Sequence, residues 1–294
     1  MKAARWRANT FNCGSMMNSM PHSHPPVALS IAGLDPSGGA GIIADIRTFS
    51  AFGCFPTAAV TSVTFQNTLG VFGAVHQTSD SVRSQVLPLS EDFTISCVKT
   101  GMLPTSEIIE EVVRLFIEGV IPQPIVDPVA RSTSGHTLID NAAVKSLVEK
   151  LVPISRLLTP NLSEAELMTG LKVVDEDGML KAAIQLADMG AQAVLVKGGH
   201  LKASGIGAPE IETASDLLFA DGEITWFRGP RIHSNSTHGT GCSLSAGIAA
   251  ALGRGRSLDQ AVAAAKQFVA EAIRTAPELG HGNGPMNFEV EVGL

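Results

Sequence analysis

Apolar and polar positions follow two different periods along this chain, and the two periods alternate. Short continuous apolar runs, typical of strands buried on both faces, are followed by stretches with the spacing of amphipathic helices. The first run is Val27 to Ala32, and the stretch from Ala40 to Gly53 is predicted to be a helix that ends at a glycine. Further strands are expected at 57–65, 71–76, 94–99, 124–127, 156–159 and 193–197, and further helices at 79–87, 106–118, 141–150, 163–169, 176–189, 240–252 and 258–274.

The last third of the chain adds an antiparallel feature to this pattern. Two predicted strands, 216–220 and 223–227, are separated only by Asp221-Gly222, which favours a two-residue hairpin turn. Because strand and helix alternate elsewhere, the sequence predicts an α/β fold of three layers, α/β/α, with a mostly parallel central sheet and a small antiparallel edge hairpin. Residues 27–294 are expected to form this single domain. Residues 1–26 are polar and lack the apolar stretch of a secretory signal, so we expect a disordered N-terminal extension.

Composition narrows the functional class. The chain has 294 residues, of which 45% are hydrophobic and 17% charged, enough apolar material for a large core. The formal net charge of −7 and the absence of a Lys/Arg cluster argue against a nucleic-acid partner. No apolar run reaches the roughly 18 to 20 residues that span a membrane. The cysteines at 13, 54, 97 and 242 suggest neither a zinc site nor a disulfide framework, so we expect a cytoplasmic protein.

The first motif with chemical content is the glycine-rich loop Gly33 to Gly41, which follows a strand and opens a helix. Glycines let the backbone approach a ligand, and a helix start presents free N–H groups. The loop is not a dinucleotide-binding turn, because no acidic residue lies between Asp45 and Asp80 to hold a ribose. It is not a P-loop either, since no Gly-Lys-Ser/Thr follows. A tight strand-to-helix turn is the alternative to a ligand-binding loop.

The second motif, His238 to Ser243, stands at the start of an Ala-rich helix. Small residues at a helix N-terminus can form an anion hole for a phosphoryl group in transfer. Cys242 falls in the first helical turn, where the helix dipole is expected to lower the pKa of a thiol, so that it could accept a proton from a substrate hydroxyl. The alternative is a small buried cysteine without chemistry.

Three further motifs lie where predicted strands end, the edge at which open α/β sheets bind ligands. Glu164 falls in the first turn of a helix after one strand, where a carboxylate can hold Mg²⁺ or cap the helix. Lys197 ends another strand and is followed by two glycines, a pattern suited to nucleotide phosphates. Asp127 and the segment 99–102 also end strands but carry a weaker signal.

Taken together, these motifs resemble the hydroxymethylpyrimidine and phosphomethylpyrimidine kinases of the ribokinase-like superfamily, over about Val27 to Pro285. Most members of that superfamily end the Gly-Thr-Gly motif with Asp, whereas the pyrimidine branch carries Cys, as Cys242 does here. The specific segments are 31–41, 66–68, 99–103, 159–165, 197–200, 237–242 and the ending 280–285.

The resemblance implies a kinase that uses ATP and Mg²⁺ to phosphorylate hydroxymethylpyrimidine and then its monophosphate in thiamine biosynthesis. It implies that Cys242 is the base, and that Gly239, Thr240 and Gly241 belong to the catalytic anion hole. It also assigns the pyrimidine pocket to Gln66, Asp45, Gly33, Met102 and Val129, nucleotide binding to Lys197, Asn161 and Lys266, and magnesium binding to Glu164 and Asp127. The family further suggests a homodimer.

One segment departs from the family pattern. Where the family has Met and Lys after the Asp-Pro-Val sequence, this chain has Ala130 and Thr133, in a segment expected to form a flap over the substrate. The lysine that is absent at Thr133 could help to hold the monophosphate, so the change concerns the second phosphorylation. Two other functions are compatible with the sequence: a pyridoxal kinase of the same branch, and a non-catalytic ligand-binding relative. Cys242 argues against the second, because a binding protein needs no proton acceptor.

Overall fold

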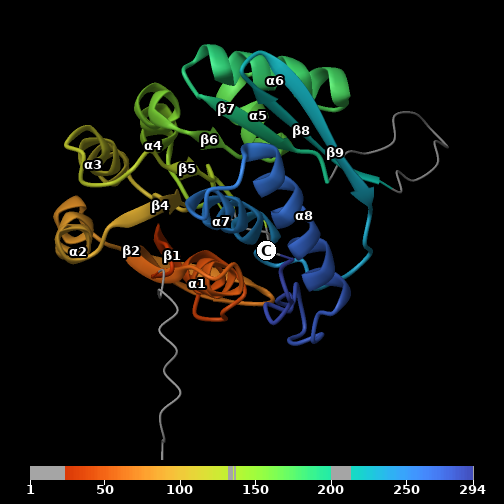
Figure 1. The fold of residues 1–294 in the computed structure, drawn as a ribbon, viewed down its shortest axis with the longest axis horizontal. Coiled ribbons are helices and arrows are strands. Elements are labelled where there is room, and N and C mark those ends of the chain that lie inside the picture. The colour runs from red at the N-terminus through yellow and green to blue at the C-terminus, as the bar shows by residue number, and fades with distance from the viewer. Residues whose placement is uncertain (1–23, 132–134, 136, 200–212, 294) are drawn as a thin grey trace, which may run out of the picture.

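The computed structural model describes residues 24–131, 135, 137–199 and 213–293. Within these ranges one nine-stranded sheet runs through the molecule in the order β3-β2-β1-β4-β5-β6-β7-β8-β9, with helices on both faces (Figure 1). The strands are β1 (Val27–Leu34), β2 (Phe55–Asn67), β3 (Gly70–His76), β4 (Ile95–Thr100), β5 (Ile125–Val126), β6 (Leu157–Leu158), β7 (Ala193–Lys197), β8 (Thr213–Ala220) and β9 (Glu223–Pro230). The α-helices are α1 (Gly41–Ala51), α2 (Ser79–Asp92), α3 (Ser106–Ile117), α4 (Asn141–Ser146), α5 (Leu162–Thr169), α6 (Glu176–Asp188), α7 (Thr240–Gly253) and α8 (Leu258–Arg274).

The predicted mostly parallel sheet with an antiparallel edge hairpin is confirmed. The strands from β2 to β7 pair in parallel through the middle of the sheet. The hairpin of β8 and β9 joins β7 antiparallel at one edge. The opposite edge is also antiparallel, because β3 turns back on β2 after a short turn and pairs with it. The strand β3 was expected, but its place at the second edge was not.

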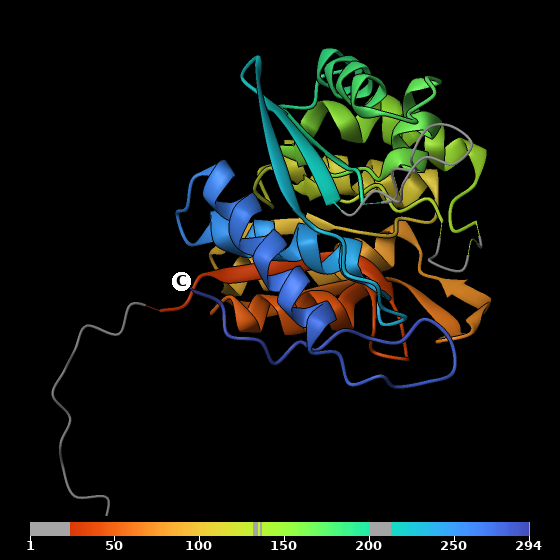
Figure 2. The ribbon, with the colours of Figure 1, turned by 90° about the vertical axis from the view of Figure 1, so that its right-hand side faces the viewer.

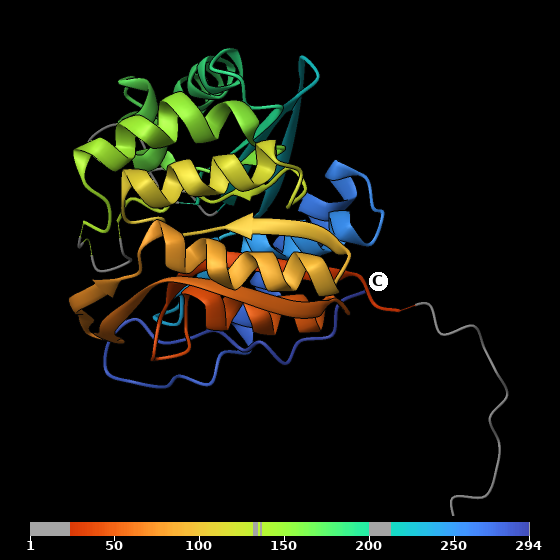
Figure 3. The same ribbon diagram turned by 90° about the vertical axis from the view of Figure 1, so that its left-hand side faces the viewer.

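Neighbouring residues of the central strands face opposite layers, which explains their continuous apolar runs. Ala28 packs toward α1, α7 and α8, whereas Leu29 packs toward the layer of α2 to α6. The same alternation separates Ile125 from Val126 in β5. Figure 2 shows α1, α7 and α8 together on one face, and Figure 3 shows α2 and α3 on the other. Each face of the sheet thus has its own core.

Two helices differ from the sequence prediction at proline residues. The helix α2 was expected to stop at Leu87 but continues through Pro88 to Asp92, since a proline near a helix end removes only one hydrogen bond. The helix expected at 141–150 changes at Leu147 into a π-helical turn, and a 3₁₀ turn containing Pro153 follows it. Among the described residues, no helix is both long enough and apolar enough to cross a membrane.

The motifs found in the sequence converge at the carboxyl ends of the parallel strands. The glycine-rich loop leaves β1, Gly101 follows β4, Asp127 follows β5, Asn161 comes shortly after β6 and Lys197 ends β7. In a parallel sheet these ends share one edge, so loops far apart in sequence meet there.

Candidate active site

The glycine-rich loop is organised around the carboxylate of Asp35. This buried side chain accepts hydrogen bonds from the N–H and hydroxyl of Ser37, at 2.8 and 2.7 Å, and from the N–H of Ala40 at 2.9 Å. Burial opposes its charge, but these bonds and the contact with His238 hold the pKa of Asp35 below its usual value. At Gly41, where φ is +56°, a Cβ would lie 2.2 Å from the carbonyl oxygen of Gly33. The loop is therefore a fixed structure that tolerates only glycine there.

The two glycine-rich motifs pack directly against each other. A Cβ added to Gly239 would lie 1.9 Å from the carbonyl oxygen of Gly39, and one added to Gly39 would lie 2.4 Å from the ring of His238. His238 Nε2 lies 2.7 Å from Asp35 Oδ2, which links the loops through side chains as well. No side chain caps α7, whose N-cap is Gly239 in the left-handed conformation. The start of α7, with Thr240 and Gly241, thus lies beside the first loop, and the Thr240 N–H already donates to the Thr237 carbonyl at 3.4 Å.

The half-buried thiol of Cys242 lies between these two loops. The N–H of Gly41 donates to its sulfur. The pKa of Cys242 is raised to about 11: burial is the main cause, Lys99 opposes it, and the carboxylates of Asp127 and Asp45 act in the same direction as burial. The expectation that the helix end lowers this pKa is therefore wrong for the free protein. Burial and two nearby carboxylates outweigh the helix dipole and the lysine.

Asp127 and Glu164 form an acidic pair beside Lys197. The Lys197 ammonium lies 2.8 Å from Asp127 Oδ1, whereas Asp127 Oδ2 is buried without a hydrogen-bond partner. Burial and the charge of Asp127 raise the pKa of Glu164 to about 7, against the opposing effects of Lys197 and two backbone N–H groups. Within the described part of the chain, Asp127 Oδ2 has no hydrogen-bond partner, and such an oxygen next to a second carboxylate fits a divalent cation, whose positive charge would balance both carboxylates.

The helix that carries Glu164 is capped as the alternative interpretation predicted. Glu164 Oε2 accepts the Asn161 N–H at 2.8 Å, and Asn161 Oδ1 accepts the Glu164 N–H at 2.9 Å. The Ala130 N–H also donates to the Glu164 carboxylate, so the segment expected to form the flap contacts the same group. Capping therefore fixes the orientation of Glu164 and does not exclude a role in binding a cation.

Lys197 lies at the anion hole. Lys266 contacts Asp216, which in turn binds Gly198, the residue that follows Lys197. A Cβ on Gly241 would be 3.2 Å from Lys197 Nζ. Lys266 Nζ lies 2.5 Å from Asp216 Oδ2, and the other oxygen of Asp216 accepts the Gly198 N–H at 2.9 Å. The two lysines are thus connected through Asp216, although only Lys197 lies next to the start of α7.

Two members of the expected pyrimidine pocket are in contact. A Cβ on Gly33 would lie 3.2 Å from the sulfur of Met102, which is itself buried. Gln66, next to a bulge in β2, has a half-buried side-chain amide that makes no hydrogen bond within the described part of the chain. Its donors and acceptor remain available for a polar ring.

Asp45 is placed differently from the other pocket residues. It is fully buried, with its oxygens 3.0 and 2.9 Å from the ammonium of Lys99, and Ser30 donates a third hydrogen bond at 2.5 Å. Lys99 is equally buried; the sequence indicated the segment 99–102 only weakly and gave Lys99 no role of its own. Its signal is a lysine inside an otherwise apolar strand, which must find a partner when buried.

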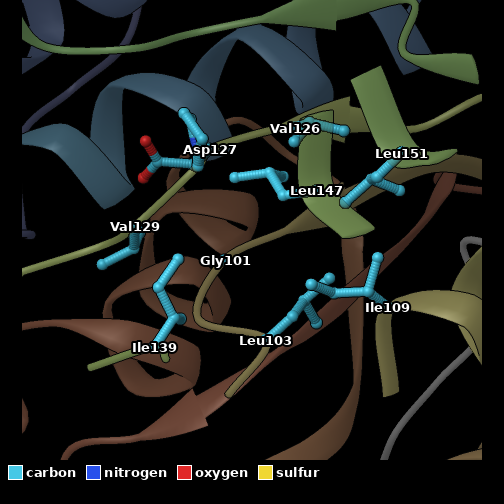
Figure 4. Close-up of a pocket in the computed structure, with 10 residues that line it drawn as sticks. Gly101, Leu103, Ile109, Val126, Asp127, Val129, Ile139, Leu147 and Leu151 are labelled. Carbon is cyan, nitrogen blue, oxygen red and sulfur yellow. The ribbon is translucent and has the colours of Figure 1, made fainter. Parts of the chain in front are cut away.

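Val129 lines a small cavity next to the acidic pair. Figure 4 shows Val129 and Asp127 on one side of this cavity and apolar side chains on the other. Ala130, in the segment expected to be a flap, is buried, and its carbonyl accepts the Leu138 N–H at 2.9 Å. Thr133, the other departure from the family pattern, lies outside the described residues. The cavity is lined by Gly101, Leu103, Ile109, Val126, Asp127, Pro128, Val129, Ile139, Leu147 and Leu151.

Comparison with known sequences identifies close relatives. The family model for phosphomethylpyrimidine kinase matches residues 35–287. The hydroxymethylpyrimidine/phosphomethylpyrimidine kinase of Bacillus subtilis is 43% identical over 88% of this chain and 93% of its own length. The thiamine biosynthesis bifunctional protein ThiED of Geobacter sulfurreducens is 40% identical over 88% of this chain, which spans 51% of that larger protein.

Comparison with solved structures gives two kinds of neighbour. The phosphomethylpyrimidine kinase of Clostridium difficile superposes with a TM-score of 0.73 at 35% identity, covering 84% of this chain and 99% of that one. The pyridoxal kinase of Staphylococcus aureus, in complex with AMP-PCP and pyridoxal, gives a TM-score of 0.79 at 28% identity, covering 90% and 93%.

Proposed function

Because this chain belongs to the phosphomethylpyrimidine kinase family, we propose that it phosphorylates hydroxymethylpyrimidine with ATP and then phosphorylates the monophosphate, using the residues described above. The chain is a kinase of thiamine biosynthesis. The observation that carries the assignment of its site is the packing of the two glycine-rich loops around Cys242. This packing sets a proton acceptor beside a row of backbone N–H groups.

In the first transfer, Cys242 receives the proton of the substrate hydroxyl while the hydroxyl oxygen bonds to the terminal phosphorus of ATP. The bond between that phosphorus and the bridging oxygen breaks, and ADP leaves with the electron pair. Since the pKa of Cys242 is about 11 in the free protein, the thiol is protonated at rest and must release this proton to solvent before the thiolate can accept the proton of the substrate hydroxyl. Lys99 favours ionisation of the Cys242 thiol, whereas Asp127 and Asp45 oppose it. A cation bound at Asp127 would neutralise one of these two carboxylates.

Groups of the chain itself stabilise the negative charge of the phosphoryl group. The N–H groups of Gly239 and Gly241 at the start of α7 would bind the phosphoryl group, Thr240 lies between them with its N–H donated to the Thr237 carbonyl, and Lys197 lies next to Gly241. Asn161, at the start of α5, and Lys266, in α8, contribute to nucleotide binding. Asp127 and Glu164 would hold Mg²⁺, which supplies positive charge to the phosphates when bound.

The pyrimidine ring binds between β1, β2 and β4. Gly33 and Met102 give it an apolar floor, and Val129 covers it from the cavity side. Gln66 provides an amide that can pair with the amino group and ring nitrogen. Asp45 is held in a fixed position by Lys99 and Ser30, and the charge of Lys99 compensates its own.

The second transfer needs less from Cys242. Its acceptor is the phosphate of the first product, which is already anionic and has no alcohol proton to lose. The same N–H groups and Lys197 then hold two phosphates near each other. The replacement of Lys by Thr133 in the flap removes one cation that relatives can supply to this step.

Cys242→Ala tests these roles directly. For the first transfer we expect kcat to fall by about 10²- to 10⁴-fold, the usual contribution of general-base catalysis. For the second transfer, measured with the monophosphate and MgATP, we expect a much smaller fall. An equal fall in both steps would contradict the base assignment, and wild-type protein inactive on hydroxymethylpyrimidine would overturn the proposed function.

Pyridoxal kinase activity is the second candidate, because the S. aureus neighbour that holds pyridoxal is as similar in fold as the phosphomethylpyrimidine kinase neighbour. Assays of wild-type protein with hydroxymethylpyrimidine and with pyridoxal, at equal concentrations and with MgATP, compare the two functions. We expect the higher kcat/KM for the pyrimidine.

The protein is also proposed to form a homodimer through the edge hairpin of β2 and β3. Phe65, Leu69, Phe72 and Val75 are 51%, 62%, 70% and 55% exposed on this hairpin. Among the described residues, the edge strand β3 pairs only with β2, so one side of it is open to another strand. Exposed apolar side chains on an open sheet edge are typical of an interface between subunits.

A further inference from the structure

A segment that the proposed reaction does not use connects the pyrimidine pocket to the anion hole. Residues Gly280–Pro285, called here the C-terminal strap, follow α8 and reach the turn between β2 and β3. The N–H groups of His281 and Gly282 donate to Thr68 Oγ1 at 3.2 and 3.3 Å, and the Asn283 N–H donates to the Thr68 carbonyl at 2.8 Å. Figures 2 and 3 show this blue segment running along the edge of the molecule to the orange hairpin. Thr68 is two residues from Gln66, so the strap holds the end of the pocket strand.

The glycines of the strap are required by this contact. A Cβ on Gly282 would lie 2.1 Å from the backbone oxygen of Thr68. A Cβ on Gly280, where φ is +86°, would lie 2.5 Å from Thr68 Oγ1. Backbone atoms cannot yield as a flexible side chain can, so any larger residue at 282 pushes the strap and the hairpin apart.

The other end of the strap binds the anion hole. The His238 N–H donates to the Gly284 carbonyl at 3.1 Å, and the Gly284 N–H donates to the Asn235 carbonyl at 2.8 Å. His238 directly precedes Gly239, and its ring contacts Asp35 in the first glycine-rich loop. Hydrogen bonds therefore attach the strap at one end to the turn after the Gln66 strand and at the other end to His238, whose ring contacts the first loop.

The strap continues into a segment that is fixed to the body of the protein. Met286 and Phe288 are buried against Ala44 of α1 and Ala272 of α8. The guanidinium of Arg47 lies 4.3 Å from the centre of the Phe288 ring. The strap is thus anchored in the core on one side and reaches the hairpin on the other.

We propose that the C-terminal strap is a positioning element, which sets the distance between the pyrimidine bound at Gln66 and the phosphoryl site at Gly239 to Cys242. This inference rests on the proposed function. The hairpin of β2 and β3 lies at the sheet edge, where β3 has a neighbour on one side only, and the strap gives its turn a second attachment. Transfer between two bound molecules depends steeply on their alignment, and a displacement of about 1 Å can lower the rate by about 100-fold.

Gly282→Ala tests the proposal, with Gly70→Ala as the matched control. Gly70 lies in the same turn as Thr68, has open space around its Cβ position and does not adopt a positive φ. We expect Gly282→Ala to lower kcat for hydroxymethylpyrimidine by about 10- to 100-fold. We expect unchanged ATP affinity and melting temperature in both variants, and wild-type kcat in Gly70→Ala.

A second pair of variants tests the hydrogen bonds without steric strain. Thr68→Val removes the acceptor of two strap N–H groups at nearly constant volume, whereas Thr68→Ser retains the hydroxyl. We expect Thr68→Val to lower kcat while KM for ATP stays constant, and Thr68→Ser to restore most of the rate. Wild-type kcat in both Gly282→Ala and Thr68→Val would overturn the proposal. So would a parallel loss of ATP affinity and melting temperature, because that result indicates a purely structural role.

The proposed function and the strap are tested separately by this design. If the wild-type protein does not phosphorylate hydroxymethylpyrimidine, the substrate assignment fails. If the wild-type protein does so and the strap variants match it, only the positioning role fails.

Discussion

The buried pair of Lys99 and Asp45 is the feature of single residues that most affects the chemistry. Both side chains are fully buried, so each charge depends on the other for compensation. Such pairs add little net stability, but removal of one partner costs about 3 to 5 kcal/mol because the other is left uncompensated. Lys99 also acts on Cys242, whose ionisation it favours while Asp45 opposes it.

Charge changes at this pair should move the reactivity of Cys242 in opposite directions. Lys99→Met removes the cation, so we expect the pKa of Cys242 to rise and its alkylation by iodoacetamide at constant pH to slow by about tenfold. Asp45→Asn removes the opposing carboxylate, so alkylation should accelerate. Mass spectrometry of the Cys242 peptide follows the modification, and circular dichroism verifies that both variants are folded. A change of the same sign in both variants would contradict the electrostatic account.

At the residue scale the sequence predicted which side chains gather, but not their electrostatic state. The motifs predicted correctly that Asp127, Glu164 and Lys197 lie near Cys242, at the carboxyl ends of the parallel strands. The pKa of Cys242 was predicted in the wrong direction because it depends on burial and on Asp45 and Asp127, which are distant in sequence. The roles assigned to individual residues in binding and catalysis remain predictions.

At the scale of secondary-structure elements, the start of α5 combines a structural and a chemical role. The capping box of Asn161 and Glu164 orders the helix end, while burial and Asp127 raise the pKa of Glu164 to about 7. A carboxyl whose pKa is raised on folding binds its proton more tightly in the folded state. Its contribution to stability is therefore present below about pH 4.5 and is lost as pH rises through about 7.

Glu164→Gln should remove this pH dependence. Glutamine can still accept the Asn161 N–H in a capping box, so the helix end is preserved. We expect the wild-type protein to lose stability on the order of 2 to 3 kcal/mol between pH 4.5 and 8 through this group, and the variant to lose less. Thermal unfolding of both proteins at pH 5 and pH 8, without Mg²⁺, measures the difference. Equal changes in melting temperature would show that Glu164 does not titrate in this range.

The elements themselves were largely predictable, and their exceptions have local causes. Apolar runs located the central strands because both faces of the sheet are covered. The continuation of α2 through Pro88 was not predictable because proline usually ends a helix, and no local signal in residues 147–151 indicates the π-helical turn after α4. The antiparallel place of β3 depends on the short turn at Thr68, which carries no strong hairpin signal.

At the scale of the whole molecule, the two sheet edges differ. The edge strand β9 has no exposed apolar residue above half exposure, whereas the opposite hairpin exposes Phe72 and its neighbours. The asymmetry places the proposed subunit interface at β2 and β3, on the strand that also carries Gln66. Dimer contacts would therefore support the pyrimidine pocket from outside.

Phe72→Asp should disrupt the proposed dimer. A buried carboxylate at the centre of an apolar interface carries a large desolvation penalty, so we expect the mass in solution to fall from twice 30.6 kDa to the mass of one chain. Ile117→Asp, at an equally exposed apolar position on α3, is the control and should leave the mass unchanged. Light scattering coupled to gel filtration measures both. A wild-type protein that elutes as a single chain would contradict the interface.

The strap also determines when the enzyme becomes active during its synthesis. The strands and loops that hold the pyrimidine emerge from the ribosome early, because Gln66 and Thr68 lie in the first quarter of the chain. The residues that fasten them, Gly280 to Phe288, are translated about 210 residues later, at about 5 to 20 residues per second. The last strand of the sheet ends at Pro230, about 50 residues before Gly280, so the sheet can form about 2.5 to 10 seconds before the strap that aligns the site has been translated.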